Sequence, residues 1–286
     1  MLTPLERWYD ADTPEVSVVI PNFNKSDLTR KCLDALWANT NGYRYEIVVV
    51  DNGSSPDDVQ NLVNAGPHLR LITLAENRYF GDACNTGAEH SKGRCLVFLN
   101  NDAFVTPDWL APLIGVLDGC LDAGAAGPRF IDPDGQLQEA GGFIDETGNS
   151  LRVGQFKPYH PREEFERRIV DYCSAACLAV PKWLFAELGS FDPIYNPAYY
   201  EDVDLCLKIA TTNRFVYYCP ESTVIHIKNA TSAHIWNAAE LHQIIERNRQ
   251  KFLSRWGNWL QARAENREIP FPTFGPSSAS HSSHEQ

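Results

Sequence analysis

Four short apolar runs in the first hundred residues constrain the fold of this chain more than any other feature. They read VSVVI, EIVVV, LRLITL and RCLVFL, and segments of helix length separate them. The first such segment begins at Ser26, and its residues Leu28, Leu33 and Leu36 recur at roughly helical spacing. Strands that alternate with helices build a parallel sheet with helices on both faces. The sequence therefore predicts an α/β fold.

The second half of the chain has a different pattern. Glycine-punctuated short strands are expected in GAAGPRF, GQLQEAGGFID and GNSLRVGQF, which predicts hairpins and a smaller mixed sheet. DYCSAACLAV and RFVYYCP predict further strands, and PKWLFAEL, EDVDLCLKIA and residues 237–262 predict helices. No linker divides this body. We expect one domain over residues 1–265 and a disordered tail over 266–286, where Ser, His and Pro dominate.

Charge and cysteine usage exclude several classes of protein. The net charge of -12 argues against a nucleic-acid partner, because such binding is driven by neutralisation of phosphates. The eight cysteines form no C-x-x-C pair, which predicts a reduced, cytoplasmic protein. The first residues resemble neither a signal nor a transit peptide, and no apolar run approaches the ~20 residues of a membrane span.

Each of the first four predicted strands ends in a cluster of polar residues. A turn is the plain explanation of any one cluster, because Asn and Asp bond to their own backbone. In an open parallel sheet, however, the carboxyl ends of the strands meet along one rim, where ligands bind. We therefore expect a ligand site there. The clusters are Pro21–Lys25, Asp51–Ser54, Glu76–Arg78 and Asn100–Asp102.

Five motifs in order resemble one enzyme family. They are VSVVIPNFN, VVVDNGS, ENRYFGDACNTG, LNNDA and GSFDPIYNPAYYEDVDLCL, within residues 15–260. This pattern resembles the inverting nucleotide-sugar glycosyltransferases of family 2, in particular rhamnosyltransferase-like members. The resemblance implies the GT-A fold, a Rossmann-like, mostly parallel central sheet flanked by helices. It also implies a nucleotide-binding half over 15–130 and an acceptor-binding half with a C-terminal helix over 131–265.

Eight residues match donor-binding positions of that family. Asp51 would accept a hydrogen bond from a uracil or thymine base, and the alternative is an N-cap for the next helix. Phe23 would lie against the base, or else pack in the core. Asn85 would line the nucleotide pocket or lie on a helix surface, and Tyr79 stands where relatives often have glycine. The eight are Pro21, Asn22, Phe23, Asp51, Asn77, Asn85, Asn100 and Asn101.

A metal site is implied by the same resemblance. Asn100-Asn101-Asp102 corresponds to the family's Asp-x-Asp motif, with Asn100 in place of the first acid. A diphosphate leaving group needs its charge neutralised, and Mg²⁺ or Mn²⁺ bound to Asp102 would do so. His226 matches a position where relatives often place a metal or phosphate ligand. A structural histidine is the equal alternative.

Inversion requires a base on the face of the sugar opposite the leaving group. The acids of EDVDLCL open a helix, where the macrodipole favours carboxylates, so a purely local role is one explanation. The resemblance assigns the base to Asp202 and contact with an acceptor hydroxyl to Glu201. Asp204 suits the local role, because Lys208 follows at i+4. The acceptor side is expected to carry four aromatic residues, although core packing explains the first of them at least as well: Trp183, Tyr195, Tyr199 and Tyr200.

The predicted reaction moves a sugar from a UDP- or dTDP-sugar, with dTDP-rhamnose as one candidate, to a glycan or lipid-linked acceptor in cell-surface polysaccharide synthesis. The alternatives are a nucleotide-sugar-binding module without catalysis and a sugar-1-phosphate nucleotidyltransferase. The latter carries a Gly-rich first turn that PNFN lacks, and a dehydrogenase would need G-x-G-x-x-G. In the long helix, Trp256 and Trp259 are expected to contact a membrane's inner face or a second copy of the chain.

Overall fold

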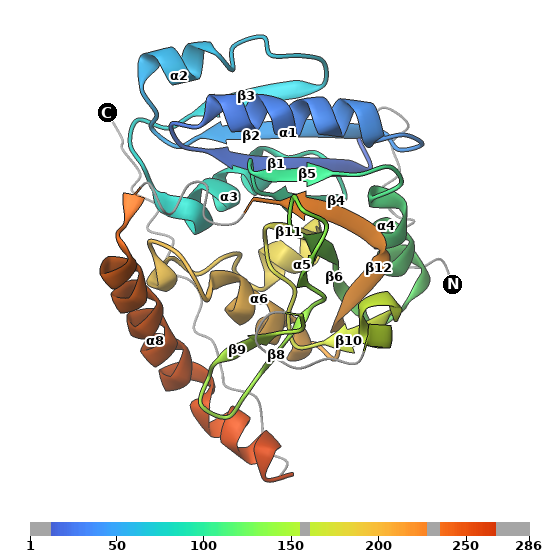
Figure 1. The fold of residues 1–286 in the computed structure, drawn as a ribbon, viewed down its shortest axis with the longest axis vertical. Helices are drawn as coiled ribbons and strands as arrows, with labels where there is room; N and C mark the ends of the chain where they lie inside the picture. The colour runs from blue at the N-terminus through green and yellow to red at the C-terminus, as the bar shows by residue number, and fades with distance from the viewer. Residues whose placement is uncertain (1–12, 155–160, 228–234, 267–286) are drawn as a thin grey trace.

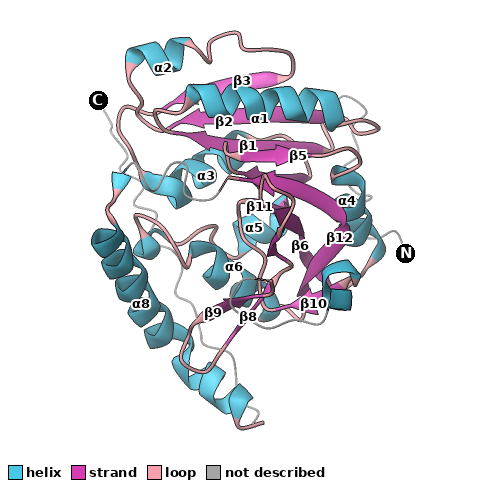
Figure 2. Ribbon diagram, viewed as in Figure 1, coloured by secondary structure: helices cyan, strands magenta, loops and turns pink. Residues whose placement is uncertain are grey.

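The computed structural model describes residues 13–154, 161–227 and 235–266, in a ten-stranded sheet, a two-stranded sheet and surrounding helices (Figures 1 and 2). The expected disorder beyond residue 266 lies outside the described residues. The strands are β1 (Val16–Asn22), β2 (Tyr45–Asp51), β3 (Leu69–Thr73), β4 (Cys95–Leu99), β5 (Ala103–Val105), β6 (Ala123–Ile131), β7 (Leu137–Glu139), β8 (Gly142–Ile144), β9 (Ser150–Arg152), β10 (Arg168–Val170), β11 (Cys177–Pro181) and β12 (Phe215–His226). The α-helices are α1 (Ser26–Asn39), α2 (Pro56–Gln60), α3 (Tyr79–His90), α4 (Leu110–Gly119), α5 (Lys182–Glu187), α6 (Glu201–Ala210) and α8 (Ala238–Ala264), and two 3₁₀ helices are η2 (Pro161–Phe165) and η3 (Pro193–Tyr195).

The first four predicted strands form the parallel part of the large sheet. The order along the sheet is β10-β12-β6-β11-β4-β1-β2-β3, and β1 pairs in parallel with both β2 and β4. Asn22 lies opposite Asp51, and Asp51 lies opposite Thr73, so the strands end in register. The predicted α/β class is confirmed, and the polar clusters after these strands gather at one rim.

The second half joins the same sheet with mixed directions. Strand β11 runs antiparallel to β4 and β6, and β6 runs parallel to β12. The strand predicted in RFVYYCP forms the first part of β12, which continues to His226. The predicted hairpin is the two-stranded sheet β8–β9.

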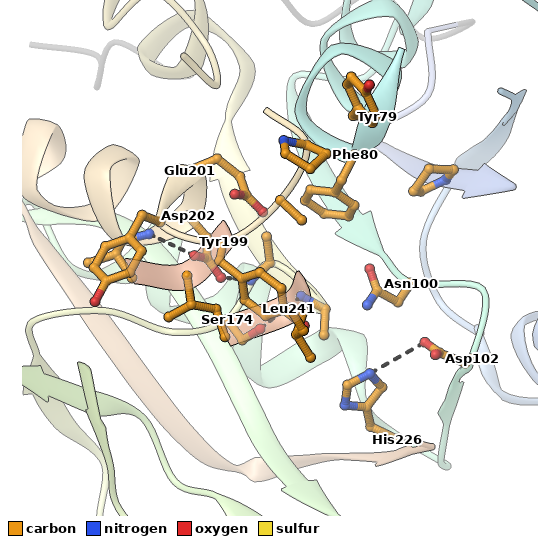
Figure 3. Close-up of a pocket in the computed structure, with 18 of the residues that line it drawn as sticks. Tyr79, Phe80, Asn100, Asp102, Ser174, Tyr199, Glu201, Asp202, His226 and Leu241 are labelled. Atoms are coloured by element: carbon orange, nitrogen blue, oxygen red, sulfur yellow. Dashed lines mark hydrogen bonds and ion pairs between the residues drawn. The ribbon is translucent and has the colours of Figure 1, made fainter. Parts of the chain in front are cut away.

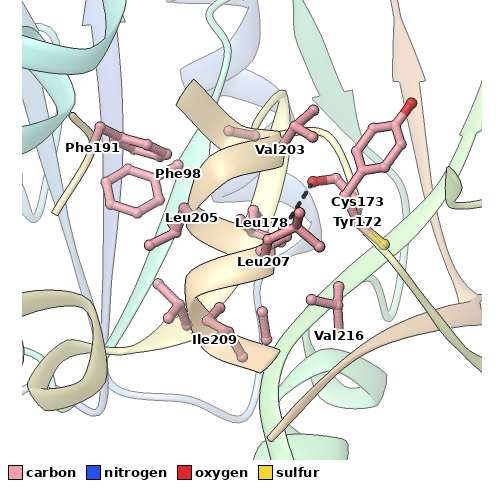
Figure 4. Close-up of a cluster of buried hydrophobic side chains, with 14 of the residues drawn as sticks. Phe98, Tyr172, Cys173, Leu178, Phe191, Val203, Leu205, Leu207, Ile209 and Val216 are labelled. Carbon is pink, nitrogen blue, oxygen red and sulfur yellow. Dashed lines mark hydrogen bonds between the residues drawn. The ribbon is translucent and has the colours of Figure 1, made fainter. Parts of the chain in front are cut away.

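Alternating side chains of the central strands pack into two cores, one on each face of the sheet. Val18 and Ile20 of β1 face α1 and α4, while Val19 faces the side that α3, α5 and α6 cover. On that second side, Phe98 of β4 packs against Phe191, with ring centroids 4.8 Å apart, beneath the apolar residues of α6 (Figure 4). Both faces are thus buried, as parallel sheets require.

Helix α8 runs along one side of the molecule and is joined to α6 by buried charges (Figure 1). Asp204 is fully buried and accepts hydrogen bonds from Tyr195 (3.0 Å), Arg255 (2.8 Å) and the Trp256 indole (2.8 Å). The Lys208 ammonium lies 3.0 Å from its other oxygen, as the i+4 spacing predicted.

The prediction that Trp256 contacts a membrane or a second copy is wrong. Its side chain is fully buried, because the indole N–H is needed to pair with Asp204 in the core. Trp259 is half-buried against Trp256 and Arg263. None of the helices that the structure describes is long and apolar enough to cross a bilayer.

Candidate active site

A cavity of about 810 Å³ opens at the carboxyl ends of the parallel strands (Figure 3). Two sets of residues line it from opposite sides. The first, here the amide wall, follows strands β1 to β4 and comprises Pro21, Asn22, Phe23, Asn52, Asn77, Asn100, Asn101 and Asp102. The second, here the carboxylate wall, comes from the later part of the chain and comprises Glu139, Arg152, Tyr172, Tyr199, Tyr200, Glu201 and Asp202.

Asn22 is the centre of a hydrogen-bond network behind the amide wall. Its Nδ2 donates to Asp51 Oδ1 and to Asp58 Oδ2, both at 2.9 Å. Its Oδ1 accepts from the Thr29 hydroxyl, which in turn accepts from Asn101 Nδ2. The end of β1 is therefore held to the ends of β2 and β4, which gives this part of the wall a fixed shape.

The turn after β2 packs directly on the segment after β3. Gly53 has a φ of +77°, and a Cβ there would lie 2.5 Å from the backbone of Glu76. The close approach lets Asn52 Nδ2 donate to Asn77 Oδ1 at 3.0 Å. Tyr79 has a φ of +66°, a conformation that glycine adopts more readily than tyrosine.

Two of the predicted donor-binding residues do not line the cavity. Asp51 is 1% exposed, and its oxygens accept hydrogen bonds from Asn22 and from the Ser54 amide. It has no direct contact with the cavity, but it holds Asn22, which lines the cavity. Asn85 is held at both ends of its amide by the backbone of Phe191. The prediction that Asn85 lines the pocket is therefore wrong, because its side chain fastens α3 to the segment before η3.

The predicted metal residues do meet. His226 Nε2 lies 3.4 Å from Asp102 Oδ1, which is buried and has no hydrogen-bond partner among the described residues (Figure 3). His226 Nδ1 lies 2.7 Å from Gln138 Oε1, and Gln138 Nε2 donates to Asp132 at 2.7 Å, so Gln138 presents its oxygen to the imidazole. A neutral imidazole bonded in this way has its proton on Nδ1, and its Nε2 faces Asp102.

These groups fit a divalent cation. One buried carboxylate oxygen and one imidazole nitrogen stand together with unused acceptor capacity. In the part of the chain that the structure describes, no group of three or more His, Cys, Asp or Glu residues is placed so that it could hold a metal ion by itself. Magnesium-type sites commonly take one or two protein ligands and fill the remaining positions with phosphate oxygens and water. The pair suits a cation that arrives with a phosphate-bearing ligand.

Glu201 and Asp202 lie across the cavity from the metal residues, at the start of α6 (Figure 3). Asp202 Oδ2 accepts from the Ala175 amide at 3.1 Å, and its Oδ1 accepts from the Val203 amide at 2.9 Å. Glu201 Oε2 is buried with no hydrogen-bond partner among the described residues.

The two carboxylates have different electrostatic environments. Burial raises the pKa of Asp202, while the Ala175 amide and the Arg152 guanidinium oppose that rise. Burial, reinforced by the charge of Asp202, raises the pKa of Glu201 well above its ordinary value. We infer that Glu201 holds the proton of the pair and Asp202 the charge, because the Ala175 and Val203 amides and the Arg152 guanidinium stabilise the ionised form of Asp202, whereas Glu201 has only its own backbone amide.

The segment before α6 enters the helix in a strained conformation. Tyr199 and Tyr200 have φ values of +73° and +77°. Asn248 of α8, fully buried, donates from Nδ2 to the carbonyls of Tyr195, Ala198 and Tyr199. These bonds fix the segment that carries Glu201 and Asp202.

The predicted aromatic residues separate into two groups. Tyr199 and Tyr200 line the cavity, and Tyr195 is buried behind them against Asp204. Trp183 is 42% exposed on α5, outside the cavity lining, with Arg214 stacked on its ring. The prediction for Trp183 is wrong.

Sequence reasoning missed the ion pair of Glu139 and Arg152 in the carboxylate wall. Arg152 Nε lies 3.3 Å from Glu139 Oε2, and burial raises the pKa of Glu139. The available signal was a charged residue inside the predicted short strand of GQLQEAGG. Asn52, Gln138 and Tyr172 also line the cavity without having been predicted as site residues.

Comparison with known proteins gives one family match. A model described as "Glycosyl transferase family 2" matches residues 17–178. The chain is 28% identical over 228 residues to the O-antigen biosynthesis protein RfbC of Myxococcus xanthus, covering 77% of this chain and 18% of that protein. It is 28% identical over 204 residues to the N-acetylglucosaminyl-diphospho-decaprenol L-rhamnosyltransferase of Mycobacterium tuberculosis, covering 64% of this chain and 66% of that enzyme. An uncharacterised Sinorhizobium fredii protein, y4gI, is 26% identical over 237 residues, and the chain spans only 26% of its length.

Solved structures share the fold. A structure of GalNAc-T7 with UDP, GalNAc and Mn²⁺ is 20% identical, with a TM-score of 0.69, and covers 93% of this chain and 53% of that one. A mannosyltransferase, PcManGT from Pyrobaculum calidifontis with GDP-Man and Mn²⁺, is 19% identical with a TM-score of 0.57, and covers 88% of this chain and 74% of that one.

Proposed function

This chain belongs to glycosyl transferase family 2, and from that premise we propose that it is an inverting glycosyltransferase with Asp202 as its general base. The supporting observation is the arrangement of the cavity. The Asp202 carboxylate lies on one side, held by two backbone amides, and the Asp102–His226 pair lies on the other. A sugar bound between them would have a base on one face and its leaving group on the other.

The proton transfer follows from the two carboxylates. Asp202 takes the proton of an acceptor hydroxyl while that oxygen bonds to the anomeric carbon of the donor sugar. The bond between the anomeric carbon and the diphosphate oxygen breaks on the opposite face, so the configuration inverts. Glu201, protonated through burial, has an O–H with which to hold the acceptor or sugar in place.

The diphosphate leaving group would lie at the amide wall. A divalent cation, Mg²⁺ or Mn²⁺, held by Asp102 and His226 would supply neutralisation of its charge. Gln138 pairs with His226 Nδ1 and leaves Nε2 facing Asp102, and Asn100 lines the same side of the cavity (Figure 3). With Asn100 in place of a carboxylate, the protein supplies one negative charge fewer than an Asp-x-Asp motif would.

The substrates we propose are a UDP- or dTDP-sugar donor and a glycan or lipid-linked acceptor, in cell-surface polysaccharide synthesis. The similarity to a rhamnosyltransferase named for a diphospho-decaprenol acceptor supports dTDP-rhamnose and N-acetylglucosaminyl-diphospho-polyprenol as the first pair to test. Such an acceptor would place the enzyme at the inner face of the membrane.

The central experiment replaces Asp202 with Asn. The substitution keeps the size of the side chain and removes its ability to take a proton, so transfer should fall by roughly 10²–10⁴-fold while nucleotide diphosphate affinity stays unchanged. The parent's activity should fall on the acid side as Asp202 protonates, at a pH above that of an ordinary aspartate, because burial raises its pKa.

The same measurements separate the alternative functions. A folded Asp202→Asn protein with parental transfer would contradict the base assignment and leave Glu201 as the next candidate. A parent that binds the donor without turning it over would be a binding module. Release of diphosphate from a nucleoside triphosphate and a sugar 1-phosphate would indicate a nucleotidyltransferase.

A further inference from the structure

We propose that Glu139 and Arg152 bind the acceptor. They recognise the sugar hydroxyl adjacent to the hydroxyl that Asp202 deprotonates. The inference rests on the proposed function and narrows it: the acceptor is a saccharide ring with neighbouring hydroxyls, rather than an isolated alcohol of a lipid or a peptide.

The first observation is the position of the pair. Glu139 ends β7 and Arg152 ends β9, strands that belong to different sheets, yet both residues line the cavity beside Asp202. Glu139 Oε1 accepts from the Ser174 amide at 3.0 Å, and Asp202 Oδ2 accepts from the next amide, Ala175, at 3.1 Å. Two consecutive backbone amides thus hold two carboxylates side by side.

The second observation is that Glu139 is buried, Arg152 is half-buried, and the hydrogen bonding between them is incomplete. The Glu139 side chain is 4% exposed and that of Arg152 is 30% exposed. Arg152 Nε lies 3.3 Å from Glu139 Oε2 but, among the described residues, makes no hydrogen bond that meets normal geometry. Buried ion pairs that serve stability alone need their hydrogen bonds completed to offset desolvation. Here both residues of the incompletely bonded pair line the cavity.

The third observation is Glu201, on the other side of Asp202. Its Oε2 is buried without a hydrogen-bond partner in the part of the chain that is described, and the residue is 8% exposed and lines the same cavity. Buried polar atoms in native proteins are almost always hydrogen-bonded, so an orphan at a cavity indicates a ligand group. The cavity around Asp202 is therefore lined by two incompletely bonded groups, Glu201 and the Glu139–Arg152 pair.

The chemistry of these groups fits a polyol. A hydroxyl donates one hydrogen bond and accepts others, so a carboxylate with a neighbouring guanidinium meets both needs. Asp202 is the acceptor for the reacting hydroxyl, and Glu139 with Arg152 contacts a second hydroxyl. The side chains of Tyr199 and Tyr200 bring aromatic surface to the same wall. An isolated alcohol has one hydroxyl and would leave the pair unsatisfied.

The test combines substrate and side-chain deletions. The acceptor probe is polyprenyl-diphosphate-linked N-acetylglucosamine, together with methyl hexosides, each compared with its deoxy analogues. In the parent, loss of the hydroxyl next to the reacting one should lower transfer by about 10- to 100-fold, the worth of a hydrogen bond to a charged group. In Glu139→Ala that penalty should nearly disappear, and in Glu139→Gln it should shrink. UDP and dTDP affinity with Mn²⁺ should not change.

A matched control and a second variant complete the design. Glu164→Gln breaks the Arg129–Glu164 ion pair, whose side chains are both 20% exposed and lie outside the carboxylate wall, and should leave the deoxy penalty at the parental value. Arg152→Lys keeps the charge but loses the planar donors, so it should raise the acceptor KM more than it lowers kcat. If Glu139→Ala fails to fold, the acceptor KM and kcat of Arg152→Lys test the proposed subsite in its place.

Several outcomes would overturn the inference. One is an unchanged deoxy penalty in the Glu139 variants, and another is a parent that uses serine peptides or polyprenols as readily as saccharides. Complete loss of transfer to every acceptor in Glu139→Gln, with nucleotide binding intact, would make Glu139 a base instead. A parent that binds no nucleotide diphosphate with Mn²⁺ would instead refute the proposed function. Nucleotide binding shows that failure, whereas the deoxy-acceptor comparison tests only the inference about Glu139.

Discussion

The amide wall and the carboxylate wall of the cavity are built by opposite means. The amide wall follows four parallel strands whose ends are in register. Residues directly after the ends of these strands therefore lie close together. The carboxylate wall combines β7, β9, the Ser174–Ala175 turn and the start of α6, and α8 holds its segments from behind.

This difference is also one of electrostatics. Asn side chains dominate the amide wall, two of them, Asn52 and Asn77, bonded to each other, and their amides carry no charge to desolvate. The carboxylate wall contains buried acids beside a half-buried guanidinium, and amides and this counter-charge stabilise the ionised carboxylates. Regular backbone pairing supports one wall, and specific buried polar contacts support the other.

The largest expected effect comes from breaking the charge cluster behind the carboxylate wall. Asp204→Asn removes the buried partner of Arg255 and Lys208, and leaving a buried charge unpaired typically costs about 3–5 kcal/mol. The matched change near the other end of the molecule, Asp118→Asn, breaks an ion pair with Arg94 whose aspartate side chain is 41% exposed, and should cost at most about 1 kcal/mol. Denaturant unfolding measures both. Equal costs would contradict the idea that α8 is held by buried charge.

The next effect concerns the amide wall. Asp102→Asn removes its only carboxylate, so nucleotide diphosphate affinity should lose its dependence on Mg²⁺ or Mn²⁺, with a fall of roughly 10- to 100-fold at saturating metal. Asp122→Asn, at a carboxylate outside the cavity that accepts from Tyr217, is the control. Calorimetry with and without metal measures the nucleotide diphosphate affinity of both variants. Metal dependence that persists in Asp102→Asn would show that the metal binds at another site.

A smaller effect is expected from Asn248→Ala. Three backbone carbonyls before α6 lose their donor, which should cost about 1–3 kcal/mol of unfolding free energy. Because this segment positions Asp202, transfer should fall more than nucleotide affinity does. The control is Asn39→Ala, which removes a half-buried asparagine whose Nδ2 donates to the Val105 carbonyl of β5. It should leave the ratio of transfer rate to nucleotide affinity unchanged. A parallel loss of transfer and nucleotide affinity in Asn248→Ala would indicate a general structural role.

The smallest effects are opposite pH dependences of stability. Burial raises the pKa of Glu201, so its protonated form stabilises the fold below the unfolded-state pKa, and that contribution is lost as pH rises. At Asp58 burial acts in the same direction, but hydrogen bonds from Asn22 and Ser26 outweigh it and lower the pKa. Its contribution is present at neutral pH and lost in acid.

Glu201→Gln should therefore raise unfolding free energy at pH 7–8 relative to the parent, and Asp58→Asn should lower it there but not at about pH 3. Unfolding curves across this pH range measure both differences. If both variants changed the unfolding free energy in the same direction at neutral pH, the proposed opposite pH dependences of Glu201 and Asp58 would be contradicted.

The sequence by itself determined the parallel half of the fold and most of the amide wall. A strand pattern of period two places alternate residues in the two cores, and parallel strands in register bring their ends together without further information. Asn22, Asn77, Asn100 and Asp102 could thus be predicted to meet, and the Glu201-Asp202 pair could be placed at a helix start.

Only the tertiary structure decided the rest. Whether an aspartate faces a cavity or a neighbouring side chain depends on contacts between segments far apart in the chain, as Asp51 and Asp204 show. Asn85 and Trp256 were misplaced for the same reason, since their polar groups pair with Phe191 and Asp204. The Glu139–Arg152 pair depends on two short strands whose sequences carry little periodic signal. Local patterns record the pairing of neighbouring strands, whereas buried polar contacts form only where the completed fold brings donors and acceptors together.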